Sequence, residues 1–406
     1  LAVLFLLFQA VFSWSAYPME LIDIMFVNLQ KFTANILPQG LFNDLIVNGV
    51  LAGLGGILIF VPQIAFLFAF IAFLEDTGYM ARVSFITDKL LRGVGLNGRS
   101  IIPLLSGAAC AVPAIMSART ISSWKERMIT IMVTPLMSCS ARLPVYTLII
   151  ALIIPANDCF GFNLQGLVMM AFYLIGFLSA IFIALFLKFI IKSKERSYYI
   201  MEMPSYKIPD WKTVGYTIVE KVKVFLFDAG KIIIAISIVL WFLSSFAPGD
   251  KFQEIEQEWA GKVDAEMHIA ANKLEASYAG IIGKVIEPVI KPLGFDWKIG
   301  ISLITSFAAR EVFVGTMSTI YSVGDNNIQS IQTRLSDLKN PETGKAFFTP
   351  AVGFSLMLFY AFAMQCMSTV VIVYRETKHW KWPVIQFLYM GILAYLSSLL
   401  AFNLLS

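Results

Sequence analysis

The chain has 406 residues, of which 58% are hydrophobic and 14% are charged, and its mean hydropathy is +0.75. Soluble domains are roughly 45–50% apolar, so the composition excludes an ordinary soluble protein and indicates a polytopic membrane protein. The net charge of +4 is small and the basic residues are scattered between apolar runs, which argues against a nucleic-acid partner.

Several apolar segments approach the length of about 20 residues that crosses the hydrocarbon core of a bilayer. They are 1–16, a span whose beginning is expected to be cut, and 49–74, 128–155, 165–191, 228–247, 349–373 and 383–405. Two further segments, 100–118 and 299–323, are apolar but interrupted. The second carries Arg310 and Glu311, and because each charge in lipid costs at least ~2.5 kcal/mol, neither segment is expected to be a plain lipid-facing helix.

Basic residues mark the loops on the cytoplasmic side of a membrane protein. The segments 75–127 and 188–227 are rich in Lys and Arg and are predicted to be cytoplasmic, whereas 17–48 and 156–164 nearly lack them and are predicted to lie outside. The acidic stretch 248–298 is expected to form a small helical excursion on the outer side. Within 192–227, lysines mixed with Tyr and Trp predict an amphipathic interfacial helix with its linker, or a surface that docks a cytosolic domain.

These loop charges require segment 100–118 to enter and leave from the cytoplasm and segment 299–323 to enter and leave from outside. Each half of the chain then contains a span, a broken segment and a span with a cysteine, and the two halves run in opposite directions. Broken segments in an inverted repeat are typical of transporters, because irregular backbone is tolerated at that depth only where it is buried or lines a cavity. We therefore expect an all-α polytopic membrane protein with about seven or eight transmembrane helices and two re-entrant segments.

The predicted organisation follows from this repeat. It comprises a first span and external segment (1–48), a first repeat (49–155), a span with an amphipathic linker (156–227), a second repeat with the external insertion (228–373) and a C-terminal span (374–406).

The sequence SGAACAVPAIM places Cys110 three residues after Gly107 and three before Pro113. A proline has no N–H and clashes with the carbonyl one turn back, so a carbonyl at residue 109 or 110 should be freed beside the thiol. The alternative is that Cys110 packs as a small hydrophobic residue next to an ordinary kink.

Two other apolar segments carry a thiol next to hydroxyl groups. TPLMSCSARLPVY places Ser138 and Cys139 between two prolines, and AMQCMSTVV offers Cys366 with Thr369. Thiolate and thioether ligands suit first-row transition metals and Cu(I), whereas Mg²⁺ and Ca²⁺ sites are rich in carboxylates. A transition metal ion is therefore the favoured substrate, with a thiol redox role as a further interpretation of the cysteines.

Each of several other polar residues has two possible roles. Glu75 and Asp76 end the span 49–74, where they offer oxygen ligands to a departing cation or pair with Arg82. Gln63 either lines the path or bonds to another helix. Arg310 and Glu311 are expected to pair with each other or across the repeat and so pin their segment.

Six stretches carry a resemblance to a known family. They are LFQAVFSWSAYPMELID (7–23), FVPQIAFLFAFIAFLEDTGYMAR (60–82), IPLLSGAACAVPAIMSART (102–120), MVTPLMSCSARLPVY (132–146), FAAREVFVGTMSTIY (307–321) and QCMSTVVIVYRETKHWKW (365–382). With these motifs the chain resembles the membrane domain of the FeoB family of bacterial ferrous iron transporters. The two broken segments are similar to the paired gate elements of that family and to the hairpins of nucleoside-type transporters.

The resemblance implies Fe(II) uptake across the bacterial inner membrane, and hence a transporter rather than an enzyme. It implies that the family's GxxCxxP motif falls on Gly107, Cys110 and Pro113, that its other intramembrane cysteines fall on Cys139 and Cys366, and that Fe(II) is the transported substrate. It further implies an N-terminal domain that binds GTP with Mg²⁺ and hydrolyses it. Because no GxxxxGK[ST] motif occurs in the chain, that domain is expected to be missing here or encoded separately.

The partners implied are the lipid bilayer, the GTPase domain, small cytosolic Feo accessory proteins and further copies of the chain, with no nucleic acid. A nucleoside or other organic solute transporter is the alternative. Such a transporter would share the hairpins but should line its site with Asn, Gln and carboxylates rather than thiols.

Overall fold

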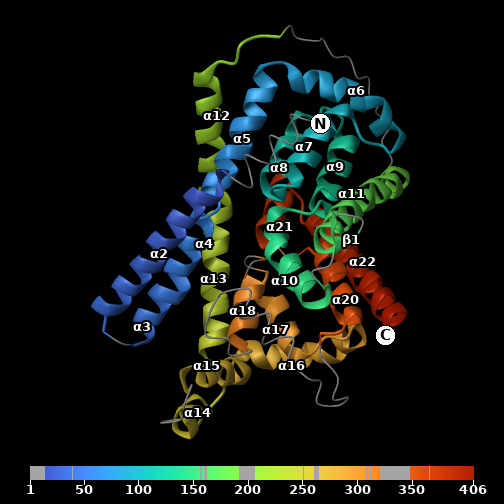
Figure 1. Cartoon of the computed structure of the whole chain (residues 1–406). Helices are drawn as coiled ribbons and strands as arrows, with labels where there is room; N and C mark the ends of the chain where they lie inside the picture. The colour runs from blue at the N-terminus through green and yellow to red at the C-terminus, as the bar shows by residue number, and fades with distance from the viewer. Residues whose placement is uncertain are drawn as a thin grey trace. The chain divides into compact units, whose positions relative to one another are not determined.

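The computed structural model of the chain describes residues 14–38, 40–155, 158–159, 162–191, 206–249, 251–259, 265–307, 310, 312–320, 348–364 and 366–406. Helices dominate this part of the chain (Figure 1). The α-helices of the first half are α2 Ala16–Ile36, α3 Leu41–Asp44, α4 Ala52–Leu58, α5 Val61–Asp76, α6 Tyr79–Gly93, α7 Ile101–Gly107, α8 Ala111–Ser117, α9 Trp124–Val133, α10 Leu143–Ile153 and α11 Leu164–Ile190.

The second half continues the helical pattern. Its α-helices are α12 Trp211–Val224, α13 Gly230–Ser245, α14 Lys251–Trp259, α15 Ala265–Ala276, α16 Tyr278–Ile290, α17 Trp297–Thr305, α18 Val312–Ile320, α20 Pro350–Phe362, α21 Met367–Thr377 and α22 Lys381–Leu405. Short 3-10 and π turns are η2 Leu45–Leu51, η3 Gly98–Ser100, η4 Ala118–Thr120, η5 Thr134–Leu136, η6 Ser140–Arg142, η7 Phe225–Ala229 and η8 Lys291–Leu293. The strands are β1 Asp158–Cys159 and β2 Phe162–Asn163, an antiparallel pair.

This architecture confirms the predicted all-α polytopic class. Within the described residues, five helical segments are long and apolar enough to cross a bilayer: Leu41–Asp76, Trp124–Ile153, Leu164–Ile190, Pro350–Thr377 and Lys381–Leu405. The predicted span 228–247 corresponds to α13, whose apolar part Ile233–Ser245 is shorter. Most of the predicted span 1–16 lies outside the described residues, so the expected total of spans stays a prediction.

Three boundaries differ from those predicted. The segment 17–48, predicted to lie outside, is largely helical and contains α2, and the span expected to begin at residue 49 begins at Leu41 through α3 and η2. The spans 128–155 and 349–373 were expected to be continuous, but each is interrupted at its cysteine. A proline accounts for the first interruption, because Pro135 cannot donate the hydrogen bond that would continue α9.

The chain divides into two compact units. Unit 1 comprises Leu1–Ser140, Ile175–Ala235 and Met367–Gln386, and unit 2 comprises Ala141–Leu174, Ile236–Cys366 and Phe387–Ser406. The division therefore follows directly after Ser140 and after Cys366, at the two interrupted spans.

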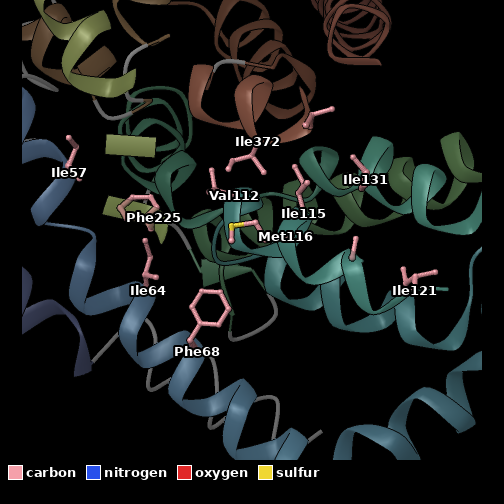
Figure 2. Close-up of a cluster of buried hydrophobic side chains, with 12 residues drawn as sticks. Ile57, Ile64, Phe68, Val112, Ile115, Met116, Ile121, Ile131, Phe225 and Ile372 are labelled. Carbon is pink, nitrogen blue, oxygen red and sulfur yellow. The ribbon is translucent and has the colours of Figure 1, made fainter. Parts of the chain in front are cut away.

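Unit 1 is built around the hairpin of α7 and α8. In Figure 2, Ile115 and Met116 of α8 lie among apolar side chains that include Ile64 and Phe68 of α5 and Ile372 of α21. Ile115 is completely buried in this cluster. Such close packing holds helices together where lipid leaves little hydrophobic driving force between them.

One buried carboxylate joins the ends of three elements of unit 1. Glu376 of α21 accepts hydrogen bonds from Arg119 Nε at 2.9 Å on each of its carboxylate oxygens, and Arg127 Nη2 lies 3.2 Å from one of them. The Glu376 side chain is only 2% exposed, and its hydrogen bonds raise the pKa of Arg119 above its ordinary value. Arg119 lies in the turn η4 that follows α8, and Glu376 lies in the last turn of α21, so the C-terminal ends of these two packed helices meet.

Unit 2 holds the second hairpin, formed by α17 and α18. The hydroxyls of Thr305 and Thr316 are 2.8 Å apart and fasten its two arms. Phe313 of α18 packs edge-on against Tyr360 of α20 at a centroid distance of 5.1 Å. Like unit 1, this unit therefore places a short two-armed hairpin against one part of an interrupted span, which agrees with the order of elements in the predicted repeat.

We expect Glu376→Gln to lower the free energy of unfolding by about 2 kcal/mol, because charged hydrogen bonds to two arginines are lost from a buried group. Thermal unfolding of the purified protein measures this change. The exposed Glu220→Gln variant on α12 should stay within about 0.5 kcal/mol of the parent. Equal losses in both variants would contradict a specific role for Glu376.

Candidate metal site

Cys110 lies in the break between α7 and α8. The helix α7 ends at Gly107, Cys110 has an extended backbone (φ −154°, ψ 131°), and α8 begins at the next residue. The buried Pro113 is the third residue of α8, so it does not break that helix but prevents it from extending backwards. The carbonyl deprived of its helical N–H is that of Ala109, four residues before Pro113.

This freed carbonyl has a partner. Ala109 accepts hydrogen bonds from Ser140 Oγ at 3.0 Å and from Ser140 N at 3.4 Å. Ser140 Oγ accepts in turn from Gln63 Nε2 at 2.8 Å. The prediction of a freed carbonyl beside Cys110 is confirmed, and Gln63 makes a hydrogen bond to another element, which is one of its two predicted roles.

Cys139 lies in the second break of unit 1. After α9 and the turn η5, Met137 to Cys139 leave the helical conformation before η6 begins at Ser140. Because Ser140 bonds to Ala109, the residues next to Cys139 and Cys110 are in direct contact. Both thiols are half-buried and unbridged by a disulfide.

Two glycines allow other helices to approach this irregular segment closely. A methyl group on Gly107 would lie 3.1 Å from Thr134 Cγ2, and one on Gly176 of α11 would lie 2.9 Å from Ser138 Oγ and 3.1 Å from the Leu136 carbonyl oxygen. Ser138 is consequently 98% buried. Gly107, the first residue of the GxxCxxP motif, therefore allows this approach because it has no side chain.

The third predicted thiol, Cys366, belongs to unit 2 and directly precedes α21. It is half-buried and free. Thr369 and its neighbour Ser368, both in the first turn of α21, are nearly fully buried. Ser368 Oγ has no hydrogen-bond partner among the described residues, which leaves its lone pairs available to a ligand.

The acidic residues at the end of α5 have different environments. Glu75 is exposed. Asp76 forms an ion pair with Lys207 at 2.9 Å and accepts a hydrogen bond from the Asp210 N–H at 2.6 Å. In this structure Asp76 therefore holds the segment 207–210, which leads into α12, next to the end of α5.

Arg310 lies in the turn between α17 and α18 and is 94% buried. Its predicted neighbour and partner Glu311 lies outside the described residues, so their pairing stays a prediction. Among the residues that the structure describes, no three His, Cys, Asp or Glu side chains gather closely enough to hold one metal ion.

Sequence reasoning missed three residues that support the two breaks of unit 1 and the ends of its helices: Gly176, Glu376 and Gln386. Gln386 offered a signal, because it is an amide within an apolar helix. Gly176 offered none, since glycines are frequent in membrane helices.

Two family models match the chain. The Gate model, described as nucleoside recognition, matches residues 57–153 and 226–380. The model of the ferrous iron transport protein B C terminus matches residues 169–221. The Fe(2+) transporter FeoB of Leptospira biflexa is 45% identical over 98% of this chain and 56% of its own length.

The chain belongs to the FeoB family. The FeoB of Staphylococcus aureus strain MSSA476 is 35% identical over 97% of this chain and 55% of its own length. A Porphyromonas gingivalis protein, named as a fusion of Fe(2+) transport protein A and FeoB, is 38% identical over 99% of this chain and 49% of its own length. The chain thus spans about half the length of these FeoB relatives. No solved structure matches it.

We expect Gly176→Ala to destabilise this FeoB chain by about 1–3 kcal/mol, because the new methyl group overlaps the Leu136 carbonyl and Ser138. Gly166→Ala on the same helix α11 is the matched control, since nothing lies within 4 Å of its added methyl group. That variant should gain about 0.5–1 kcal/mol from helix propensity. Thermal unfolding measures both, and a stabilised Gly176→Ala protein would contradict the close approach.

Proposed function

We propose that the chain is the membrane part of a ferrous iron transporter, which moves Fe(II) across the bacterial inner membrane into the cytoplasm. The observation that carries this proposal is its 45% identity over 98% of the chain to a protein named Fe(2+) transporter FeoB. The positions of the thiols add chemical support. Cys110, Cys139 and Cys366 all lie where an apolar helix is interrupted, and irregular backbone at such depth is expected at a transport path.

The ligands proposed for Fe(II) are these three thiolates, completed by the hydroxyls of Ser138 and Thr369. Imidazole and thiolate are better ligands for iron than carbonyl oxygen alone. The two histidines lie outside the candidate spans, so within the spans the thiolates are the proposed ligands. A conducting site must bind the ion strongly enough to admit it and weakly enough to release it. Ligands that lie at separate breaks of the helices, rather than in a closed cluster, meet this requirement.

Glu75 and Asp76 are proposed to meet the ion on its way to the cytoplasm. Glu75 is exposed at the end of α5. Asp76 would contribute only after it releases Lys207 and the Asp210 N–H. The gate residues Gly107, Pro113, Arg310 and Glu311 are proposed to shape and pin the hairpins rather than to bind the ion.

We propose that a GTP-binding domain and a small cytosolic protein related to Fe(2+) transport protein A act together with this chain. The Porphyromonas gingivalis relative, whose name joins such a protein to FeoB, supports the second partner. The chain itself contains no GxxxxGK[ST] motif, so we assign GTP and its Mg²⁺ to that separate domain.

We expect Cys110→Ser, Cys139→Ser and Cys366→Ser each to reduce Fe(II) uptake by on the order of tenfold or more, since lost ligand contacts weaken metal binding at least that much. Uptake of radioactive iron by cells that express the full chain measures this. The matched control is Cys159→Ser, which changes the cysteine of β1 and should leave uptake unchanged. Full uptake in all three variants, or uptake of nucleosides in place of iron, would overturn the proposal.

A further inference from the structure

Gln386 is a fully buried amide in the first half of α22. Its Nε2 donates hydrogen bonds to the carbonyl oxygens of Ile131 at 3.1 Å and of Met132 at 2.8 Å. Both carbonyls belong to the last turn of α9, which ends at Val133. One side chain of α22 thus caps the C-terminal end of another helix.

The Ile131 carbonyl needs a donor because of the sequence that follows it. The residue four positions after Ile131 is Pro135, which has no N–H to donate. Met132 is the next to last residue of α9, and beyond it the chain turns through η5 toward Cys139. No water is present in a bilayer core to hydrate such groups, so an intramolecular donor is required.

The orientation of the amide follows from its partners. Carbonyl oxygens can only accept, so the NH₂ group of Gln386 must face α9. Its Oε1 is buried with no hydrogen-bond partner among the described residues. A buried oxygen without a partner is unfavourable. Any stabilisation that Gln386 provides at this position therefore comes from the two hydrogen bonds that its NH₂ group donates.

The same arrangement occurs at the other thiol of unit 1. Pro113 frees the Ala109 carbonyl next to Cys110, and Ser140 Oγ donates to it at 3.0 Å. The carbonyls freed by Pro113 and by Pro135 therefore each accept a hydrogen bond from a side-chain donor. At the Cys139 break that donor is Gln386.

We propose that Gln386 is a positioning residue: by holding the end of α9 in its interrupted form, it fixes where the Met137–Cys139 segment presents the Cys139 thiol to the transported ion. The inference rests on the proposed function for the identity of the ion. The position of the thiol itself does not depend on that identity.

The test uses the full chain with Gln386→Leu, and with Ser398→Ala as the matched control. Ser398 is also buried on α22, but its hydroxyl bonds to Ser355 rather than to α9. The first readout is the rate at which a thiol reagent modifies Cys139, followed by mass spectrometry of its peptide. The second is Fe(II) uptake, analysed for KM and maximal rate.

Gln386→Leu should change the rate of Cys139 modification severalfold and reduce uptake efficiency by about 10–100-fold, the range found when a group that orients a metal ligand is removed. The loss should appear mainly in KM. Ser398→Ala should leave the Cys139 rate unchanged. Parental rates and uptake in Gln386→Leu, or the same change in both variants, would overturn the inference.

Pro135→Ala supplies a second comparison if Gln386→Leu does not fold. The alanine restores an N–H opposite the Ile131 carbonyl and so removes most of the need for Gln386. Adding Gln386→Leu to Pro135→Ala should then alter Cys139 modification little, and a further large change would overturn the inference. If Cys110→Ser, Cys139→Ser and Cys366→Ser all leave iron uptake unchanged, the proposed function fails, whereas the modification rates still decide the role of Gln386.

Discussion

A backbone carbonyl that loses its helical hydrogen bond inside a bilayer must find another donor, because no water is available there. Pro113 and Pro135 of unit 1 create this need next to the breaks that carry a cysteine, at Ala109 and at Ile131. The hydroxyl of Ser140 and the amide of Gln386 meet it. These two side chains stabilise the interrupted helices at Cys110 and Cys139, because they replace the missing hydrogen bonds.

Other features of unit 1 support the same irregular segments. Small residues at Gly107 and Gly176 let neighbouring helices approach the backbone around Ser138. At the opposite ends of α8 and α21, Glu376 and its two arginines hold these parallel helices together. The breaks are therefore packed closely at the two glycines, and the helix ends are held by the ion pairs of Glu376. Both sets of contacts restrict how far the thiols can move without a larger rearrangement.

Much of this arrangement could be predicted from the sequence. The composition gave the membrane class, and Pro113 gave the freed carbonyl at residue 109, because both depend on local chemistry. The interruptions at Cys139 and Cys366 were missed as breaks, since apolar character alone does not distinguish a continuous span from two shorter helices. Partners distant in the chain, such as Gln386 for Ile131 and Arg119 for Glu376, could not be paired without the fold, because sequence spacing carries no information about contacts over more than 250 positions.

The central claim is that thiolates at the helix interruptions bind Fe(II) during its passage. X-ray absorption at the iron edge of the Fe(II)-loaded full chain tests it most directly, because sulfur and oxygen neighbours scatter differently. The account predicts sulfur in the first shell of the iron, and loss of that sulfur signal when Cys110 and Cys139 are both replaced by Ser. A first shell of oxygen and nitrogen alone in the unmodified protein would contradict it.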